Sequence, residues 1–422
     1  MKICIKTLGC KVNSYESEFI RSLFLRRGYE IVEDNADIYV VNTCTVTNES
    51  DRKSRKTINS IKKNNPNAIV VALGCFCENK KANIREYIDA DIILGNYDKS
   101  KVVDYLEEYL ENKTKKEYFY DMNKVSFEDM EINKFETKAR AFVKIEDGCN
   151  NYCNYCIIPY VRGRVRSKNK DLLLKEIETL GNSGHKEIVL TGIHTGQYGR
   201  DTSEYNLAEL IHDIRGFDNI FRIRLSSIEV VELTEEVLEE LNNNNKFVSH
   251  LLIPLQSGSD QTLKDMNRIY DKENFRNKIK EIRDIRKDIS ISTDVIVGYP
   301  TETEENFIES YNFCKEMNFS KIHVFPYSDR EGTVASKSLI KVSPEEKKRR
   351  ARELINLSNE LEKKYNESFD GKELDILFEE YKEGYYIGHS SNYVKVKIKG
   401  DYRLHEIFNI KIKKEDIVEN IL

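Results

Sequence analysis

Three cysteines with a spacing suited to metal chemistry lie in the stretch "EDGCNNYCNYCIIPYVRGRVRS", residues 146–167. Cys149, Cys153 and Cys156 form a C-x₃-C-x₂-C pattern. Zinc sites and iron–sulfur clusters are both built from cysteine thiolates, and both usually take four ligands. No second C-x₂-C or H-x₃-H pair follows in this part of the chain, and Cys314 has the setting of a core thiol in an amphipathic helix. The pattern therefore favours a 4Fe–4S cluster with one iron open to a substrate or cofactor over a tetrahedral zinc site.

A second set of three cysteines is spread over the first 80 residues. Cys10, Cys44 and Cys75 stand in "TLGCKVN", "VNTCTVTN" and "VALGCFC", each just after an apolar stretch that reads as a strand. The carboxyl ends of parallel strands meet at one sheet edge, where open α/β sheets bind ligands. Cys75 is preferred over Cys77 because it directly follows a glycine and a strand, as Cys10 does. We predict a second three-thiolate cluster here; three unrelated buried thiols are the alternative.

The elements that must position these cysteines divide the chain into three folded parts. In residues 1–112, apolar strands alternate with helices, which predicts a doubly wound parallel sheet in an α/β fold. Residues 113–136 are polar and charged, and we predict a linker. Residues 137–365 contain a βα series that predicts a partial (β/α)6 barrel. Its strand candidates are 141–146, 187–192, 221–226, 250–255, 291–298 and 321–326. Residues 366–422 predict a small β-barrel.

The composition is that of a soluble globular protein. Of the 422 residues, 39% are hydrophobic and 33% are charged, and the net charge is −5. The N-terminus lacks the pattern of a signal peptide, and no stretch is apolar enough to cross a bilayer. Nine cysteines, an odd number, fit a reducing compartment, so we expect a cytoplasmic protein with no membrane partner. Neither G-x₄-G-K-[ST] nor G-x-G-x-x-G occurs, so use of a nucleoside triphosphate is not indicated.

The two cysteine sets and the order of the three parts resemble the radical S-adenosylmethionine (SAM) methylthiotransferases over essentially the whole chain. The motifs that carry the resemblance are "TLGCKVNSYES", "NTCTVT", "GCNNYCNYCIIPYVRGRVRS", "PLQSGSDQTLKDMNRIY" and "DVIVGYPTETEENF". The resemblance implies that one 4Fe–4S cluster, on Cys149, Cys153 and Cys156, binds SAM and cleaves it to methionine and a 5′-deoxyadenosyl radical. It implies that an auxiliary 4Fe–4S cluster, on Cys10, Cys44 and Cys75, carries the sulfur to be transferred. The C-terminal part resembles the RNA-binding TRAM domain.

Three branches of that family differ in substrate. One modifies N6-threonylcarbamoyladenosine in tRNA, one modifies N6-isopentenyladenosine in tRNA, and one modifies an aspartate of a ribosomal protein. The segment "TLGCKVNSYESE" is most similar to the first branch. The resemblance therefore implies a transferase that inserts a methylthio group at adenine C2 of tRNA, next to the anticodon. The other two substrates stay as alternatives, and a non-catalytic iron–sulfur or zinc RNA-binding protein is a third. We expect tRNA as partner and a monomer, and the sequence does not identify the electron donor.

Further residues are candidates for contact with SAM or RNA. The resemblance places Tyr155 beside the adenine of SAM, and Thr191 and Gly192 near its methionine part, where a tight turn is the alternative. Other residues expected at the same barrel rim are Gln256, Ser257 and Gly298. Arg162, Arg164 and Arg166 in "VRGRVRS" suit RNA phosphates or the SAM carboxylate, with a solvated loop as the alternative.

Overall fold

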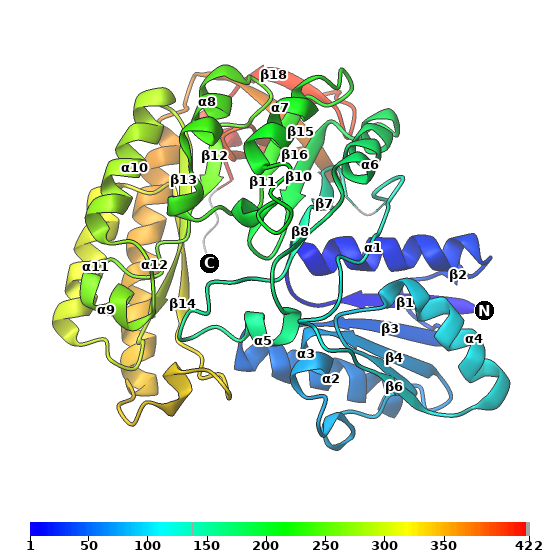
Figure 1. Ribbon diagram of the computed structural model, residues 1–422. Helices are drawn as coiled ribbons and strands as arrows, with labels where there is room; N and C mark the ends of the chain where they lie inside the picture. Colours follow the sequence, from blue (N-terminus) through cyan, green and yellow to red (C-terminus); the bar gives the residue numbers. More distant parts are fainter. Residues whose placement is uncertain (137, 419–422) are drawn as a thin grey trace.

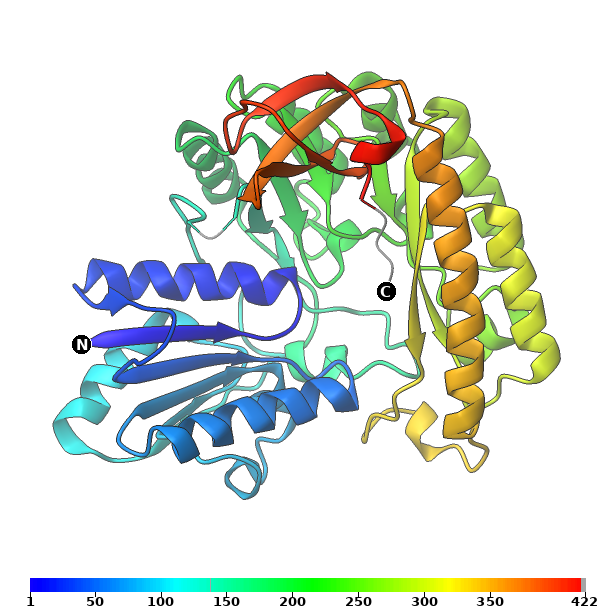
Figure 2. The same cartoon turned by 180° about the vertical axis from the view of Figure 1, so that it is seen from behind.

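The structure is a computed structural model that describes residues 1–136 and 138–418. Figure 1 shows an N-terminal α/β domain in blue and cyan and a barrel-like βα domain in green to orange. In Figure 2, the C-terminal strands, red and dark orange, lie against the barrel strands above the N-terminal domain. Within the described residues, no helix is both long enough and apolar enough to span a bilayer.

The N-terminal domain is built on a six-stranded parallel sheet. Its strands are β1 (Lys2–Thr7), β2 (Glu30–Ile31), β3 (Ile38–Thr43), β4 (Ile69–Gly74), β5 (Ile92–Leu94) and β6 (Lys116–Tyr118), in the order β2-β1-β3-β4-β5-β6. The helices are α1 (Lys11–Arg26), α2 (Asn48–Asn64), α3 (Cys75–Asn79) and α4 (Val102–Asn112), with short 3₁₀ turns η1 (Ile84–Glu86) and η2 (Lys99–Lys101).

Both faces of this sheet are covered, as the uninterrupted apolar strands predict. Val40 of β3 packs with Phe24 of α1 and Leu106 of α4 on one face. Val41, the next residue, packs with Ile58 of α2 on the other face. Successive strand residues point to opposite faces, so β3 must be apolar at nearly every position. The predicted doubly wound sheet is confirmed.

The segment 113–136, predicted as a linker, is instead part of the fold. Its strand β6 extends the N-terminal sheet, and Met130, Ile132 and Phe135 are buried in the core of the barrel domain. The Tyr15 hydroxyl of α1 donates to Met130 O at 2.6 Å, so the segment also ties the two domains together. Most of its charged residues are exposed and its buried apolar residues are widely spaced, so the sequence gives no periodic signal for this role.

The second domain is a partial barrel of six parallel strands in two sheets, as predicted. The strands are β7 (Ala141–Lys144), β10 (Glu187–Thr191), β11 (Arg222–Leu225), β12 (His250–Leu252), β13 (Ser290–Val297) and β14 (Lys321–Pro326). The sheets β11-β10-β7 and β12-β13-β14 are joined by a bridge between Ile223 and Phe247. The surrounding helices are α6 (Lys170–Asn182), α7 (Leu207–Arg215), α8 (Glu235–Asn243), α9 (Asp260–Asp265), α10 (Lys272–Ile285), α11 (Glu304–Met317) and α12 (Pro344–Glu367).

Residues alternate along the barrel strands between a helix-covered outside and a polar inside. In β13, Ile291, Val295 and Val297 join the apolar core beneath the helices. Ser290, Ser292 and Asp294 have the opposite orientation and line cavities within the barrel. A pair of short antiparallel strands, β8 (Glu146–Asp147) and β9 (Arg166–Ser167), brackets the cysteine loop and the short helix α5 (Ile158–Arg162). Further 3₁₀ turns are η3 (Thr195–Gln197), η4 (Val230–Glu232) and η5 (Ala335–Lys337).

The C-terminal part is an antiparallel sheet that curls back on itself. Strands β15 (Glu373–Lys382), β16 (Tyr385–Ser390), β17 (Lys395–Ile398) and β18 (Ile407–Lys411) pair in the order β17-β16-β15-β18, and η6 (Lys414–Asp416) follows. Ile417 then bridges to Val396 of the edge strand β17, which brings the end of the described chain back to the start of the sheet. Arg222 of β11 pairs with Asp375 of β15 at 2.9 Å and so attaches this sheet to the barrel.

Candidate active site

The barrel cysteines lie on one loop between β8 and α5. Backbone hydrogen bonds hold this loop from several sides: Cys149 N donates to Gly163 O at 3.1 Å, and Asn154 N donates to Met266 O at 3.1 Å. At Gly148, with φ of +94°, an added Cβ would lie 2.0 Å from Arg164 O, so only glycine allows the two chain segments to approach this closely. The loop is therefore fixed before any ligand binds.

Polar groups of the barrel surround these thiols. Arg268 Nη1 donates to Cys153 Sγ at 3.2 Å, and Cys149 Sγ lies 3.5 Å from His194 Nδ1. Burial raises the pKa of Cys149 and raises the pKa of Cys156 to about 12. Buried thiols of this kind ionise when a metal takes the place of the proton.

A chamber of about 210 Å³ opens beside the cysteine loop. It is lined by all three cysteines and by residues that include Tyr155, Ile193, His194, Glu229, Gln256 and Arg268. Arg268 Nε, on this wall, is buried without a hydrogen-bond partner among the described residues, as are Glu146 Oε1 and Thr191 Oγ1, which do not line the chamber. Unsatisfied buried polar atoms cost free energy unless a bound molecule pairs with them. Three free thiols beside an unpaired guanidinium donor fit an iron–sulfur cluster with SAM, whose carboxylate accepts hydrogen bonds.

The structure brings some of the predicted SAM contacts to this chamber and not others. Tyr155 and Gln256 line it, and Gln256 adopts φ of +64°, a backbone conformation that a residue with a side chain holds only under constraint. Thr191 and Gly192 lie behind the chamber wall, which is formed by the residues that follow them, 193–195. Ser257 is buried in the turn before α9, where its hydroxyl accepts from Ser259 N.

Gly298 is also away from the chamber, because it packs against Lys347 of α12. The sequence reasoning missed three ionisable residues that line the chamber: His194, Glu229 and Arg268. Arg268 lies in the quoted motif "PLQSGSDQTLKDMNRIY", but nothing in the spacing of that motif marks it as ligand-facing. Arg268 also pairs with Glu229, and this pair sets the electrostatics beside Cys153.

The N-terminal cysteines meet at the carboxyl edge of the six-stranded sheet. Cys10 directly precedes α1, Cys44 directly follows β3, and Cys75 directly follows β4. An added Cβ on Gly9, with φ of +109°, would lie 2.9 Å from Cys44 Cβ, so the first two turns are in close contact. The buried side chain of Asn13 donates to Leu8 O at 2.8 Å and to Thr43 O at 2.9 Å, which locks these turns together. Cys77 instead packs in the core on one face of the sheet.

Arg162, at the end of α5, is the residue that joins the two domains at this edge. Its side chain donates to Cys75 Sγ at 3.3 Å, to Glu16 Oε1 at 3.0 Å and to Asp147 Oδ1 at 3.0 Å. Burial raises the pKa of Glu16 and Asp147, but Arg162 and neighbouring lysines outweigh it and hold both carboxyls well below their usual range. A guanidinium so enclosed supplies fixed positive charge beside the N-terminal thiols.

The prediction that Arg162 and Arg166 contact RNA is corrected by their burial. Arg162 is 1% exposed and Arg166 is 8% exposed. Arg166 Nη1 donates to the carbonyl oxygens of Met122, Arg162 and Arg164, so its guanidinium holds the chain around the cysteine loop. The arginines of "VRGRVRS" suggested contact with RNA phosphates because sequence alone does not show the buried groups, such as Glu16 and Asp147, that pair with them. Arg164 is exposed, and RNA contact there stays a prediction.

A second chamber, of about 220 Å³, lies between the two cysteine sets. Val46 and Thr47, just after Cys44, form one part of its wall, and Tyr155 and Cys156 form another. Asp294, Ile296 and Phe325 of the inner barrel face complete it, and Gln256 is shared with the first chamber. Helix α5 runs beside this space: Ile157 and Val161 pack directly on Cys75. In Figure 1, α5 lies next to α3, at the junction of the two domains.

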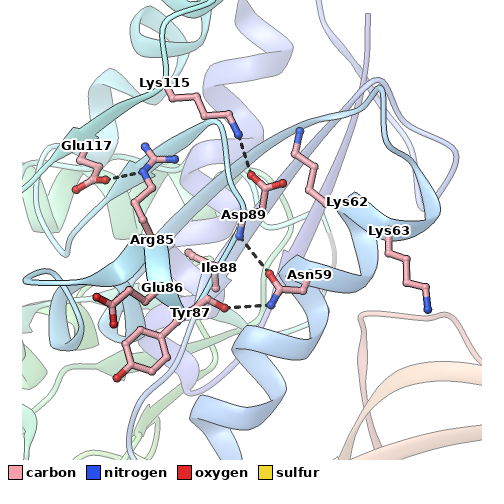
Figure 3. Close-up of a pocket in the computed structure, with 10 residues that line it drawn as sticks. All are labelled: Asn59, Lys62, Lys63, Arg85, Glu86, Tyr87, Ile88, Asp89, Lys115 and Glu117. Carbon is pink, nitrogen blue, oxygen red and sulfur yellow. Dashed lines mark hydrogen bonds and ion pairs between the residues drawn. The ribbon is translucent and has the colours of Figure 1, made fainter.

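Another hollow, about 850 Å³ in volume, lies on the N-terminal domain and is lined by none of the predicted site residues (Figure 3). Two ion pairs lie within its lining: Arg85 with Glu117 at 2.6 Å, and Lys115 with Asp89 at 2.8 Å. Across the described residues, no three His, Cys, Asp or Glu side chains converge closely enough to hold a single metal ion. An iron–sulfur cluster does not require its thiolates to converge on one metal ion, because each thiolate binds its own iron.

Fold and family comparisons define the class of protein. Residues 143–314 match the Radical SAM superfamily, and residues 2–95 match the uncharacterized protein family UPF0004. The fold is similar to the solved structure of the radical SAM methyltransferase TsrM from Kitasatospora setae, with a TM-score of 0.57. That match has 14% sequence identity and covers 79% of this chain and 74% of that one, so it bears on the fold alone. The central part of the chain therefore matches the radical-SAM class by family model, and the fold agrees with that match.

Relatives that match the whole chain narrow this class. The threonylcarbamoyladenosine tRNA methylthiotransferase MtaB of Bacillus subtilis is 41% identical over 422 residues, which cover 98% of this chain and 94% of the relative. A tRNA-2-methylthio-N(6)-dimethylallyladenosine synthase of Clostridium botulinum is 33% identical over 384 residues, 89% of this chain and 85% of the relative. The chain belongs to the radical-SAM methylthiotransferase family, in the MtaB branch.

Proposed function

We propose that this protein methylthiolates threonylcarbamoyladenosine in tRNA at adenine C2. The observation that carries the proposal is the chamber between the two cysteine sets, in a chain that is 41% identical to an MtaB protein over nearly its full length. A base in this chamber would lie between a site for radical formation and a site for sulfur delivery. The reaction replaces one C–H bond by a C–S bond and needs both sites next to the same carbon.

Two 4Fe–4S clusters and SAM are the cofactors of this chemistry. Cys149, Cys153 and Cys156 would hold one cluster, and Cys10, Cys44 and Cys75 would hold the other. When bound, SAM at a reduced cluster supplies radical chemistry that removes a hydrogen atom, and SAM also supplies the methyl group. The chain's own residues hold the loops, exclude water and fix charge: Arg268 lies beside Cys153, and Arg162 lies beside Cys75.

The inner barrel wall would position the base. Ile296 and Phe325 offer an apolar surface to the ring, and the amide of Gln256 and the carboxyl of Asp294 offer hydrogen-bond partners to its edge. Burial raises the pKa of Asp294 to about 6, so this carboxyl is poised to change protonation near neutral pH. The substrate is cytoplasmic tRNA, and we place the protein in the cytoplasm as a monomer.

The test is a nucleoside analysis by mass spectrometry of tRNA from a strain that lacks the gene. The proposal expects loss of the 2-methylthio derivative of threonylcarbamoyladenosine, with the dimethylallyl derivative unchanged. Complementation with the intact gene restores the lost nucleoside, and complementation with Cys44→Ala does not. Persistence of the 2-methylthio threonylcarbamoyl nucleoside would contradict the proposal, and loss of the dimethylallyl derivative instead would point to the other tRNA branch.

A further inference from the structure

A third cavity lies deeper in the barrel and has no role in the reaction described above. It has a volume of about 310 Å³ and lies where all three domains meet. Lys11 comes from the N-terminal domain, β12 to β14 give the barrel wall, and the C-terminal sheet gives His389, Tyr393 and Lys395. The wall also carries two further imidazoles, His250 and His323, and three serine side chains, Ser290, Ser292 and Ser320. A lining with this many hydrogen-bonding side chains is suited to binding a small polar group.

The cavity continues the inner wall that forms the base chamber. On β13, Ser292 lines the cavity and Asp294 lines the chamber; on β14, His323 lines the cavity and Phe325 lines the chamber. Residues two apart on a strand share a face and are separated by about 6.6 Å. A group attached to a base in the chamber therefore has only a short distance to cross before it reaches the cavity.

Lys11 is the cation best placed at this junction. It directly follows Cys10, and its Nζ donates to Ser226 O at 3.4 Å. Within the described chain, no carboxylate oxygen lies within 4.0 Å of Lys11 Nζ, whereas Lys321 of the same cavity pairs with Glu362 at 2.5 Å. A partly buried ammonium without a counter-ion favours an anionic ligand.

Besides Lys11, the lining holds the paired Lys321 and Glu362, Lys395 on the side of the C-terminal sheet, and several neutral hydrogen-bonding groups. His250 and His323 have pKa values lowered by burial and by the nearby cations, Lys11 among them, so both imidazoles are neutral at pH 7. His250 Nε2 lies 3.0 Å from Ser292 Oγ, while its buried Nδ1 has no partner among the described groups. Tyr393 stacks on the His250 ring at 4.6 Å and fixes its orientation. Lys11 at the junction, together with these neutral partners, suits a ligand with one carboxylate and one hydroxyl.

We propose that this cavity binds the threonylcarbamoyl group on N6 of the substrate adenine, with Lys11 pairing to its carboxylate. The inference rests on the proposed function and adds how the enzyme selects its substrate. The threonine part of that group carries one carboxylate and one hydroxyl. A dimethylallyl group carries neither, and it would leave Lys11 and His250 without partners in a desolvated site. A site built for polar groups rejects an analogue that lacks them much more strongly than an apolar pocket rejects an extra group.

The experiment measures binding of anticodon stem-loop RNA to the reconstituted holoprotein. Two RNAs are compared: one carries threonylcarbamoyladenosine, and the other carries the same group with its carboxylate converted to the carboxamide. We expect the wild type to prefer the carboxylate about 10- to 100-fold, the range for a charge-assisted hydrogen bond. Lys11→Met and Lys11→Gln should reduce this preference to less than about 3-fold. Lys11→Gln keeps a hydrogen-bond donor for Ser226 O, so the same comparison can be made with it if Lys11→Met fails to fold.

Lys395→Met is the matched control, because it removes a lysine from the same cavity on the side of the C-terminal sheet. It should keep most of the preference. A preference that survives both Lys11 variants, or one lost in Lys395→Met alone, overturns the role of Lys11. Methylthiolation of the carboxylate RNA by the wild type is measured in parallel. Product without a carboxylate preference overturns this inference and leaves the proposed function standing, whereas no product from either RNA overturns the proposed function itself.

Discussion

The two cysteine sites are built in opposite ways. The barrel site takes all three cysteines from one loop of eight residues, 149–156, which backbone hydrogen bonds hold to the surrounding chain. The N-terminal site takes one cysteine from each of three turns that are about 30 residues apart, and it exists only when the parallel sheet has formed. The first site is local in sequence and the second is a product of tertiary structure.

The two sites also differ in where the arginine beside their cysteines comes from. Arg268, beside Cys153, comes from the barrel itself. Arg162, beside Cys75, comes from the barrel domain and enters the N-terminal domain, where it also pairs with Glu16. The N-terminal site is therefore completed by a residue of the other domain. A substitution at the domain junction should disturb this site more than the barrel site.

The largest expected effect is a separation of the two activities by cysteine replacement. Cys153→Ala should abolish SAM cleavage, whereas Cys44→Ala should keep cleavage and lose methylthio insertion, with iron falling from about eight to about four per chain in each. The measurement is 5′-deoxyadenosine and methylthio-nucleoside formation after anaerobic reconstitution. Cys77→Ala is the matched control and should keep both activities, since Cys77 packs in the core. Equal loss of cleavage in the first two variants would contradict the division of roles.

Arg162→Met should lower the free energy of unfolding by about 3–5 kcal/mol, because it leaves two buried carboxylates short of a partner. Denaturant unfolding followed by circular dichroism measures this. The variant should also lose iron from the N-terminal site while SAM cleavage continues. Arg164→Met, two residues away and exposed, should stay within about 0.5 kcal/mol of the wild type. If the two variants are equally stable, Arg162 does not join the domains as described.

Glu187 gives a pH test at the opposite junction, between the barrel and the C-terminal sheet. Burial raises its pKa, but Arg224 and Arg222 outweigh burial and lower the pKa from 4.5 to about 2. A lowered pKa means that the ionised carboxylate stabilises the fold above pH 4.5 and that this stability is lost as the pH falls toward 2. Glu187→Gln should cost about 3 kcal/mol at pH 7 and progressively less below pH 4.5.

Urea unfolding at pH 7, 4 and 3 measures the stability difference between the wild type and Glu187→Gln. Glu235→Gln, the replacement of an exposed residue at the start of α8, should change the stability much less than Glu187→Gln does at pH 7. A stability difference for Glu187→Gln that stays constant from pH 7 to pH 3 would rule out the assigned ionisation.

The smallest effect is expected at Arg268. Arg268→Met removes the hydrogen bond to Cys153 but none of the thiols, and loss of such a supporting contact typically costs 10- to 100-fold in metal affinity or activity. We expect slower SAM cleavage and a changed electron paramagnetic resonance spectrum of the reduced barrel cluster. Arg276→Met, on the outer surface of α10, should change neither. An unchanged spectrum in Arg268→Met would exclude an electronic role.

Periodicity and spacing were sufficient for the framework of the molecule. The apolar runs predicted the doubly wound sheet and all six barrel strands, because buried strands leave a strong local signal. The cysteine triplet of residues 149–156 is also a local pattern, and so is the position of Cys10, Cys44 and Cys75, each just after a predicted strand. The role of these six residues as cluster ligands stays a prediction that the cysteine variants test.

What the sequence concealed depends on pairing between distant residues. Arg162 reads as a surface arginine until Glu16 and Asp147 are placed beside it. The segment 113–136 reads as a linker because only a few of its residues are buried, and those are too widely spaced to show a period. Lys11 carries no signal beyond its place after Cys10, since its cavity is assembled from three domains.

The division of roles between the two sites is tested most directly by following one hydrogen atom. A stem-loop RNA with threonylcarbamoyladenosine deuterated at adenine C2 is given to the reconstituted protein with SAM and a reductant. Mass spectrometry should find the deuterium in 5′-deoxyadenosine and a methylthio group at C2 of the same base. Formation of the methylthio product with 5′-deoxyadenosine free of deuterium would contradict a radical site and a sulfur site acting on one carbon.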